Sequence, residues 1–119
     1  MLVVDDNLVN QKVIVGMLGF LGYETDVAAD GVEAVESVTT SSYDVVLMDI
    51  YMPNMDGFEA TREIRRRETE RYTPIVAVTA SGLASDREEC FAAGMDDCLV
   101  KPVDRGTLAA VLLRMTDAT

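Results

Sequence analysis

The sequence predicts an α/β fold in which helices cover both faces of a five-stranded parallel sheet. Five short runs of β type alternate with five helical segments along the chain, which is the order that such a sheet requires. The runs at 45–48 and 74–79 are almost continuously apolar, as is typical of strands buried on both faces. The chain has 119 residues, 49% hydrophobic and 26% charged, which suits one globular domain. We therefore predict a single domain over residues 1–119.

The first strand is predicted at residues 2–4, an apolar run that stops at two acidic residues. Asn7 offers a side-chain oxygen that can cap the following helix, and Gly22 suits the left-handed position just beyond the helix end. One apolar stripe of this helix should face the core: Ile14, Met17, Leu18 and Leu21. A second stripe lies on another side of the helix: Val9, Val13, Gly16 and Phe20. This second stripe either packs against a neighbouring helix or, at its N-terminal end, docks a partner.

The second strand is predicted at residues 23–28, where Glu24 and Asp26 indicate an edge of the sheet. Asp30 and Gly31 then open a second helix. Its inward residues are predicted to be valines: Val32, Val35 and Val38.

The third strand follows the apolar run 45–48 and ends at Asp49. The turn at Asp56-Gly57 leads into a third helix. The arginine run at 65–67 suggests an anion site or a solvated helix face. We favour the solvated face, because glutamates flank the run in a strongly acidic chain.

The last two βα units occupy the remainder of the chain. Residues 74–79 form the fourth strand, and a capping box at 85–88 starts a short helix. The fifth strand, residues 97–100, ends at Lys101, and Asp104 caps the last helix. The simplest order that buries the apolar strands and leaves the polar second strand at an edge is 2-1-3-4-5. This is the doubly wound, flavodoxin-like arrangement.

Charge and composition exclude several classes of function. The formal net charge is −11, so nucleic acid and anionic membrane surfaces would repel the chain, and we expect basic partners or metal cations. No apolar run is long enough to span a bilayer, and the first residues do not resemble a signal peptide. The two cysteines, Cys90 and Cys98, indicate a reducing compartment. We expect a cytoplasmic domain with no direct membrane contact and, because the first strand begins at residue 1, a trimmed fragment.

Residues with chemical potential follow four of the five predicted strands. Asp5 and Asp6 follow the first strand, and the third, fourth and fifth end at Asp49, Thr79 and Lys101. Because the C-terminal ends of parallel strands meet at one edge, these side chains should lie together, which disfavours a purely structural strand-end role for Asp49. Three neighbouring carboxylates repel one another unless a cation joins them. A set of oxygen ligands without histidine favours Mg²⁺.

These groups suit phosphoryl transfer, in which a protein mainly positions groups and neutralises charge. Asp49 would be the nucleophile and would form an acyl phosphate. Mg²⁺ would bridge a carboxylate oxygen and one phosphoryl oxygen. Lys101 would pair with a second oxygen, and the Thr79 hydroxyl with the Ala80 main-chain amide would reach the third. The chain contains no histidine, so any phosphohistidine donor must belong to another molecule or domain.

Four segments also resemble one known family: VVDDN (3–7), VVLMDIYMPNMDGFEA (45–60), PIVAVTA (74–80) and GMDDCLVKP (94–102). They look like the receiver domain of two-component response regulators, in the family's order and over essentially the whole chain. The resemblance implies that Asp49 is the phosphoacceptor for a phosphohistidine donor. It also implies that Asp5, Asp6 and the Tyr51 main-chain carbonyl belong to the Mg²⁺ site.

The resemblance further implies that Thr79 is the family's switch hydroxyl and Lys101 its invariant lysine, with a cis peptide before Pro102. The family's switch aromatic, three residues before the lysine, is replaced here by Cys98. A thiol cannot swing a large ring into the space that Thr79 vacates. We therefore expect signalling by phosphoryl relay alone, without the aromatic half of the switch.

The segment DDNLVNQKV at 5–13 is most similar to receivers fused to hybrid sensor histidine kinases. The expected parent is such a kinase, which would tether this domain if it is membrane-bound. The expected partner is the dimerisation and phosphotransfer domain of a histidine kinase or a histidine phosphotransfer protein. The residues expected to dock it are Leu8, Val9, Lys12, Val13 and Pro102.

Other interpretations remain open at this point. The chain could be a free-standing single-domain response regulator. A haloacid-dehalogenase-like phosphatase also uses an aspartate nucleophile and Mg²⁺, but it needs a second acid two residues later, where this chain has Tyr51. A pseudo-receiver would bind no Mg²⁺, whereas every acidic residue of the site is present here. As a phosphoacceptor the domain would assist its own phosphorylation and dephosphorylation, and kinase activity would belong to the parent chain.

Overall fold

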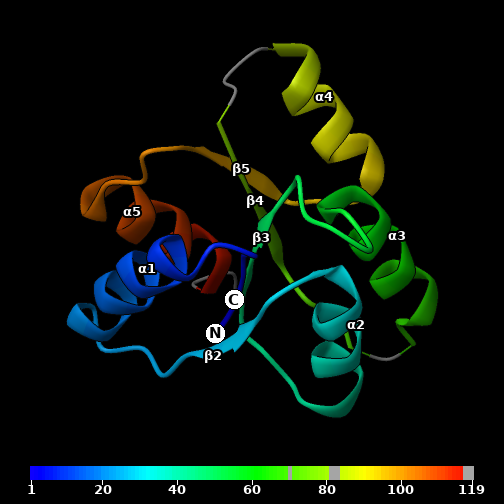
Figure 1. The fold of residues 1–119 in the computed structure, drawn as a ribbon, viewed down its shortest axis with the longest axis horizontal. Helices are drawn as coiled ribbons and strands as arrows, with labels where there is room; N and C mark the ends of the chain where they lie inside the picture. The colour runs from blue at the N-terminus through cyan, green and yellow to red at the C-terminus, as the bar shows by residue number, and fades with distance from the viewer. Residues whose placement is uncertain (70, 81–83, 117–119) are drawn as a thin grey trace.

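The computed structural model describes residues 1–69, 71–80 and 84–116. Its centre is a parallel sheet in the order β2-β1-β3-β4-β5 (Figure 1), which confirms the predicted fold class and strand order. The strands are short: β1 (Leu2–Val4), β2 (Asp26–Ala28), β3 (Val46–Asp49), β4 (Ile75–Thr79) and β5 (Asp97–Val100).

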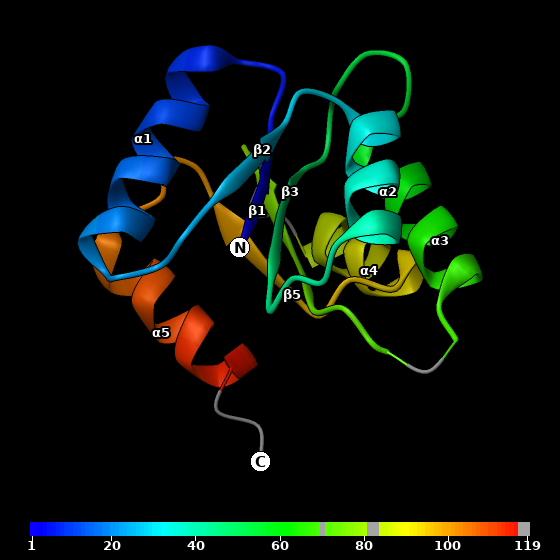
Figure 2. The same cartoon turned by 90° about the horizontal axis from the view of Figure 1, so that it is seen from below.

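Helices cover both faces of the sheet: α1 (Leu8–Phe20), α2 (Gly31–Thr40), α3 (Gly57–Arg67), α4 (Ala84–Ala93) and α5 (Arg105–Thr116). Figures 1 and 2 show α1 and α5 on one face and α2, α3 and α4 on the other. Each face has its own core, because successive residues of a strand point to opposite faces. Leu47 packs with the α1 and α5 side chains, and Met48 packs with those of α2, α3 and α4. The third strand is therefore buried on both faces, as predicted.

The register of the sheet sets the geometry of its C-terminal edge. Val4 of β1 pairs with Met48 of β3, so the next residues, Asp5 and Asp49, leave the sheet side by side. On the other side of β3, Asp49 pairs with Val78. Parallel pairing thus brings residues that are distant in sequence to one edge.

The helix ends follow the predicted capping chemistry in several places. The Asn7 side chain accepts hydrogen bonds from the backbone amides of Val9 and Asn10 at the start of α1. Gly22 has φ 92° just beyond that helix, where a side chain would be strained. The predicted capping box at Ser85 is wrong, because α4 begins at Ala84 and Ser85 lies inside its first turn.

Two further local predictions are corrected by the structure. β2 is shorter than the predicted 23–28, because the Tyr23 amide donates to the Leu18 carbonyl and closes the end of α1 instead. Val32 does not face inward and is 42% exposed. The inward face of α2 is made by Ala34 and Val35, because α2 begins at Gly31 and its helical phase turns Val32 away from the sheet.

The second stripe of α1 is exposed. Val9, Val13 and Phe20 are 68%, 51% and 72% exposed, so packing against a neighbouring helix does not bury this stripe. At its C-terminal end, the Arg105 guanidinium of α5 lies 4.1 Å from the centre of the Phe20 ring. The apolar side chains nearer the N-terminus of α1 are left on the surface.

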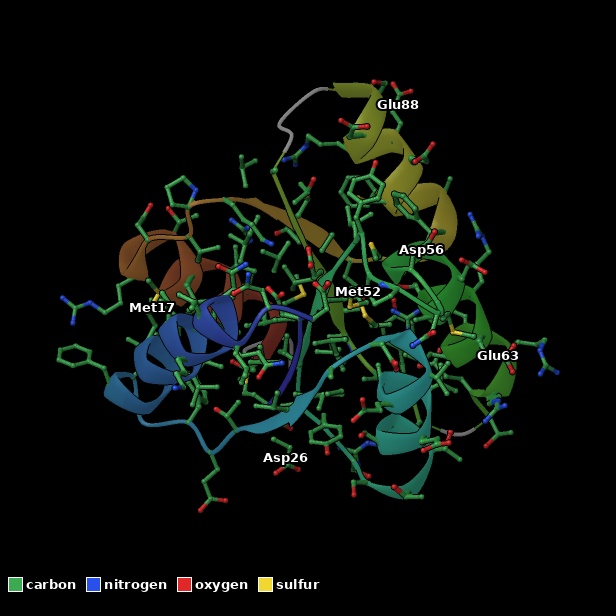
Figure 3. The ribbon with its side chains drawn as sticks, in the orientation of Figure 1. Met17, Asp26, Met52, Asp56, Glu63 and Glu88 are labelled. Atoms are coloured by element: carbon green, nitrogen blue, oxygen red, sulfur yellow. The ribbon has the colours of Figure 1, made fainter. Side chains whose placement is uncertain are left out.

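The arginine run in α3 divides into two kinds of residue. Arg66 and Arg67 pair with Glu63 on the outer surface of α3 (Figure 3), as predicted for a solvated helix face. For Arg65 that prediction is wrong, because its side chain is only 17% exposed. Its guanidinium donates to the Gly94 carbonyl at 2.9 Å and to Asp96 at 2.9 Å. Arg65 thus joins α3 to the segment between α4 and β5.

Candidate functional site

Three carboxylates meet at the C-terminal edge of the sheet. One ligand atom each from Asp5, Asp6 and Asp49 lies within 4.8 Å of the others. Asp5 and Asp49 are buried, at 1% and 7% exposed, and Asp6 is exposed to solvent. Figure 2 shows the loops after β1, β2 and β3 at this same edge of the molecule. The sequence-based expectation that these carboxylates lie together agrees with this geometry.

Lys101 contributes an ammonium group to the same cluster. Its Nζ lies 3.2 Å from Asp49 Oδ1 and 3.7 Å from Asp5 Oδ2. Asp5 Oδ2 is buried and accepts no hydrogen bond from any described residue. A buried carboxylate oxygen without a donor costs free energy unless a cation reaches it. One ammonium beside three carboxylates leaves an excess of negative charge, which suits a divalent cation.

Burial and the neighbouring charges both influence the protonation of Asp49. Burial raises the pKa of the Asp49 carboxyl, and the nearby charge of Asp5 raises it further. The ammonium of Lys101 and the backbone amide of Ile50 act in the opposite direction and lower this pKa. A divalent cation among these carboxylates would favour the ionised form. The all-oxygen donor set fits a hard cation such as Mg²⁺.

Two residues that sequence reasoning missed hold the backbone of the site. The Gln11 side chain is buried and its Nε2 donates to the Asp5 carbonyl at 2.5 Å. The Gly57 amide donates to the Ile50 carbonyl at 2.6 Å. A Cβ at Gly57 would lie 2.4 Å from the Asp49 carbonyl oxygen. No local sequence pattern marks Gln11. The pair Asp56-Gly57 predicts a turn, but it does not indicate how closely Gly57 approaches Asp49.

The remaining expected phosphate-binding groups lie at the ends of neighbouring strands. Thr79 is buried at the end of β4, and the exposed Ala80 follows it. Tyr51 lies in the loop after Asp49, and its side chain is 68% exposed. The peptide bond between Lys101 and Pro102 is cis, as the family resemblance implied.

Cys98 lies inside the sheet rather than at its edge. It pairs with Ala77 of β4 and is 7% exposed. The other cysteine, Cys90 of α4, is also buried, and both are free thiols. Burial and the neighbouring Cys98 raise the pKa of Cys90 to about 12. Both thiols therefore behave as small core residues, as expected, since a thiol must ionise to react.

The expected docking residues line a surface next to the acidic cluster. Leu8 is 67% exposed, and Lys12 is also on the surface. A shallow pocket of about 400 Å³ lies between α1 and the segment after β5. The residues that line this pocket are Asn10, Val13, Ile14, Lys101, Pro102 and Val103. Lys101 therefore takes part in both the acidic cluster and the pocket.

No helix among the described residues has the length and apolar character that crossing a membrane requires.

Comparison with known proteins identifies the family. Residues 1–113 match the family described as the response regulator receiver domain. The chain is 42% identical to the sensor histidine kinase RcsC of Salmonella typhimurium, over 93% of this chain and 12% of RcsC. It is 42% identical to the sensor protein GacS of Pseudomonas syringae, over 97% of this chain and 13% of GacS. The chain thus spans about an eighth of the length of these relatives.

Two solved structures extend the comparison to the fold and the site. The receiver domain of the sensor histidine kinase PA1611 from Pseudomonas aeruginosa is 49% identical, with a TM-score of 0.91 over 98% of this chain and 96% of that domain. That structure holds a magnesium ion in its active-site cleft. The Saccharomyces cerevisiae Ssk1 receiver domain, solved with the phosphotransfer protein Ypd1, matches with a TM-score of 0.90 and 28% identity, over 98% of this chain and 87% of that one.

The family match covers nearly the whole chain, and the strand order and acidic edge have the form that the resemblance implied. A receiver domain serves in two-component phosphorelay signalling. This chain belongs to the response regulator receiver domain family.

Proposed function

We propose that this receiver accepts a phosphoryl group on Asp49 from a phosphohistidine of another protein or domain. The observation that carries this proposal is the contact of one buried carboxylate with two further acids and an ammonium group. Asp49 is the only member that ends a central strand and lies against both Lys101 and the acidic residues after β1. That position supports Asp49 as the acceptor and Asp5 and Asp6 as further ligands of the metal.

In the transfer, a carboxylate oxygen of Asp49 attacks phosphorus while the bond from phosphorus to the histidine nitrogen breaks. The electron pair of that bond returns to the imidazole, which takes up a proton. Lys101 pairs with one phosphoryl oxygen, and the Thr79 hydroxyl and Ala80 amide bind another. The product carries about two negative charges at neutral pH, about one more than the ionised Asp49 carboxylate that it replaces.

The residues that would hold Mg²⁺ are Asp5, Asp6 and Asp49, with the Tyr51 main-chain carbonyl. This donor set fits the ion, since it offers carboxylate and carbonyl oxygens. The PA1611 receiver, 49% identical to this chain, holds magnesium in its cleft, which supports the assignment. Bound Mg²⁺ would neutralise charge on the phosphoryl oxygens during transfer.

We propose that the donor is a histidine phosphotransfer protein or the dimerisation and phosphotransfer domain of a histidine kinase. Such a partner would dock on the exposed face formed by Leu8, Val9, Lys12, Val13 and Pro102. The pocket between Val13 and Pro102 also contains Lys101, so a histidine held there lies close to Asp49. The Ssk1 receiver, with the same fold, was solved in complex with such a phosphotransfer protein.

The parent protein is proposed to be a hybrid sensor histidine kinase. This domain would lie in the cytoplasm, and it would be tethered there if the parent kinase is bound to a membrane. The relatives RcsC and GacS are far longer than the matched region. A free-standing response regulator would use the same site. A phosphatase of the haloacid dehalogenase kind is disfavoured, because Tyr51 replaces the acid that its mechanism requires.

Incubation with acetyl phosphate and Mg²⁺, followed by mass measurement, tests the proposal. The wild-type chain should gain the mass of one phosphoryl group, and Asp49→Asn should not. Omission of Mg²⁺ should abolish the gain. A stable phosphate on both chains would contradict the assignment of Asp49.

A further inference from the structure

The loop between β3 and α3, residues 50–56, is held at its far end by the turn between β2 and α2. Asn54 Nδ2 donates to Asp30 Oδ2 at 2.9 Å. Beside this bond, the Gly31 amide donates to the Met55 carbonyl at 3.2 Å. Figure 2 shows the two connections side by side at the edge that carries the acidic cluster. Figure 3 labels Met52 within this loop and Asp56 just before the start of α3.

The two carboxylate oxygens of Asp30 accept hydrogen bonds from two different segments, the first turn of α2 and the loop between β3 and α3. Oδ1 accepts the Glu33 amide at 2.9 Å and caps α2, while Oδ2 accepts the Asn54 side chain. The hydrogen bond from Glu33, and after it the one from Asn54, lowers the pKa of Asp30. The carboxylate is therefore ionised at neutral pH and is a strong acceptor for both donors.

The backbone on both sides of this contact leaves little freedom. Asn54 has φ 68°, a left-handed conformation that asparagine tolerates better than most residues. A Cβ at Gly31 would lie 2.4 Å from the Met55 carbonyl oxygen. The two connections therefore approach as closely as glycine permits.

Tyr51 depends on these anchors because its own side chain does not hold it. That side chain is 68% exposed. The loop is fixed at one end by the 2.6 Å bond from the Gly57 amide to the Ile50 carbonyl. Toward its other end it is fixed by the contacts of Asn54 and Met55. The backbone that carries the Tyr51 carbonyl lies between these two anchors.

We propose that Asp30 is a positioning residue for the metal site: through Asn54 it holds the loop that offers the Tyr51 carbonyl to Mg²⁺. This inference rests on the proposed function and extends it to a residue outside the acidic cluster. Asp30 does not touch the metal or the phosphoryl group. It acts by limiting the conformations of residues 50–56.

Three variants separate the contact from the rest of the fold. Asn54→Gly keeps the left-handed backbone and removes the side-chain amide. Asp30→Ser keeps an oxygen that caps α2 and removes Oδ2. Asp30→Asn keeps the cap and can bond Asn54 after that amide turns over. The measurement is the dissociation constant for Mg²⁺ alone. It comes from an NMR titration that follows the backbone amides of Asp49 to Met52.

Asn54→Gly and Asp30→Ser should each weaken Mg²⁺ binding by about threefold, as expected for loss of one partly exposed hydrogen bond. The double variant should be no weaker than either single one, because both remove the same contact. Asp30→Asn should bind Mg²⁺ with the same dissociation constant as the wild-type chain. In the metal-free chain, the first two variants should also speed hydrogen exchange at Tyr51 and Met52.

Asp104→Ser is the matched control, because Asp104 caps α5 by accepting the Thr107 amide at 2.8 Å. It should leave the Mg²⁺ dissociation constant unchanged. If the wild-type chain binds Mg²⁺ and the Asn54 and Asp30 variants bind it equally well, the positioning role is overturned and the proposed function stands. If the wild-type chain binds no Mg²⁺, both are overturned.

Discussion

The Lys101 ammonium lies between two carboxylates, 3.2 Å from Asp49 Oδ1 and 3.7 Å from Asp5 Oδ2. One positive charge thus lies against two of the three clustered carboxylates. Bound Mg²⁺ would supply positive charge to Asp5, and Lys101 would then be available to pair with a phosphoryl oxygen. The metal-free site is therefore a place where negative charge is only partly compensated.

The pH dependence of stability follows from the raised pKa of Asp49. The folded chain holds this proton more tightly than the unfolded chain, so stability falls as the pH rises from 3.8, the ordinary pKa of an aspartate side chain, through the folded pKa. Asp49→Asn removes this loss and should stabilise the metal-free protein at neutral pH. The difference in the free energy of unfolding between Asp49→Asn and the wild-type chain should shrink as the pH approaches 3.8. Urea unfolding at several pH values, without metal, measures this.

Addition of Mg²⁺ provides the control for that experiment. Mg²⁺ should raise the free energy of unfolding of the wild-type chain more than that of Asp49→Asn, because binding to the folded state is linked to stability. An Asp49→Asn chain that is less stable than wild type at neutral pH would contradict the picture of uncompensated charge.

Gly57→Ala tests how tightly the phosphoacceptor backbone is packed. The new Cβ would lie 2.4 Å from the Asp49 carbonyl oxygen and 2.8 Å from Ile50 Cα, both of which are backbone atoms that cannot turn aside. We expect a loss of about 2 kcal/mol in the free energy of unfolding and slower phosphorylation by acetyl phosphate.

Gly16→Ala is the matched control in the same chain. Apart from the nearby backbone of its own helix, a Cβ at Gly16 would have no heavy atom of the described residues within 4 Å. Alanine is more favourable than glycine in a helix interior by about 0.5–1 kcal/mol. This variant should be slightly more stable than wild type and should be phosphorylated normally. Equal behaviour of the two alanine variants would refute the close packing behind Asp49.

Arg65→Met should strongly lower the free energy of unfolding, although Arg65 does not belong to the acidic cluster. Its guanidinium bonds Glu68 and Asp96, at 2.8 and 2.9 Å, and stacks 4.1 Å from the centre of the Tyr72 ring. Removing it leaves two half-buried carboxylates without their cation, which costs about 3 kcal/mol. Thermal and urea unfolding measure the loss.

The adjacent Arg66 separates this effect from a general loss of positive charge. Its side chain is 71% exposed and pairs with Glu63 on the surface. Arg66→Met changes the net charge by the same amount and should leave stability essentially unchanged. Similar losses in both variants would show that net charge, and not the Arg65 contacts, controls stability.

The acidic edge could be predicted from the sequence because it follows from strand order alone. Once β1 and β3 are neighbours, Asp5 and Asp49 must emerge together, whatever the helices do. Side-chain contacts between distant segments carry no such local signal. Arg65 meets Gly94 and Asp96, 29 and 31 residues away, and Asn54 meets Asp30 at a separation of 24. The prediction that Val32 faces the core is wrong for a local reason: the residue at which α2 begins sets the helical phase and turns Val32 away from the sheet.

Val13→Glu should impair phosphoryl exchange with a histidine partner while leaving the chemistry at Asp49 intact. Val13 is 51% exposed on α1 and lines the pocket that Lys101 and Pro102 also line. A carboxylate there would lose apolar contact and be desolvated on docking, so we expect transfer from a phosphorylated histidine phosphotransfer protein to slow by about tenfold or more. Acetyl phosphate needs no docking surface, and its reaction should keep its wild-type rate.

Val32→Glu is the matched control, because Val32 is a 42% exposed valine of α2 on the other face of the sheet. This variant should leave both reactions unchanged. If Val13→Glu slows both donors alike, its effect lies in the site and the proposed docking face is wrong.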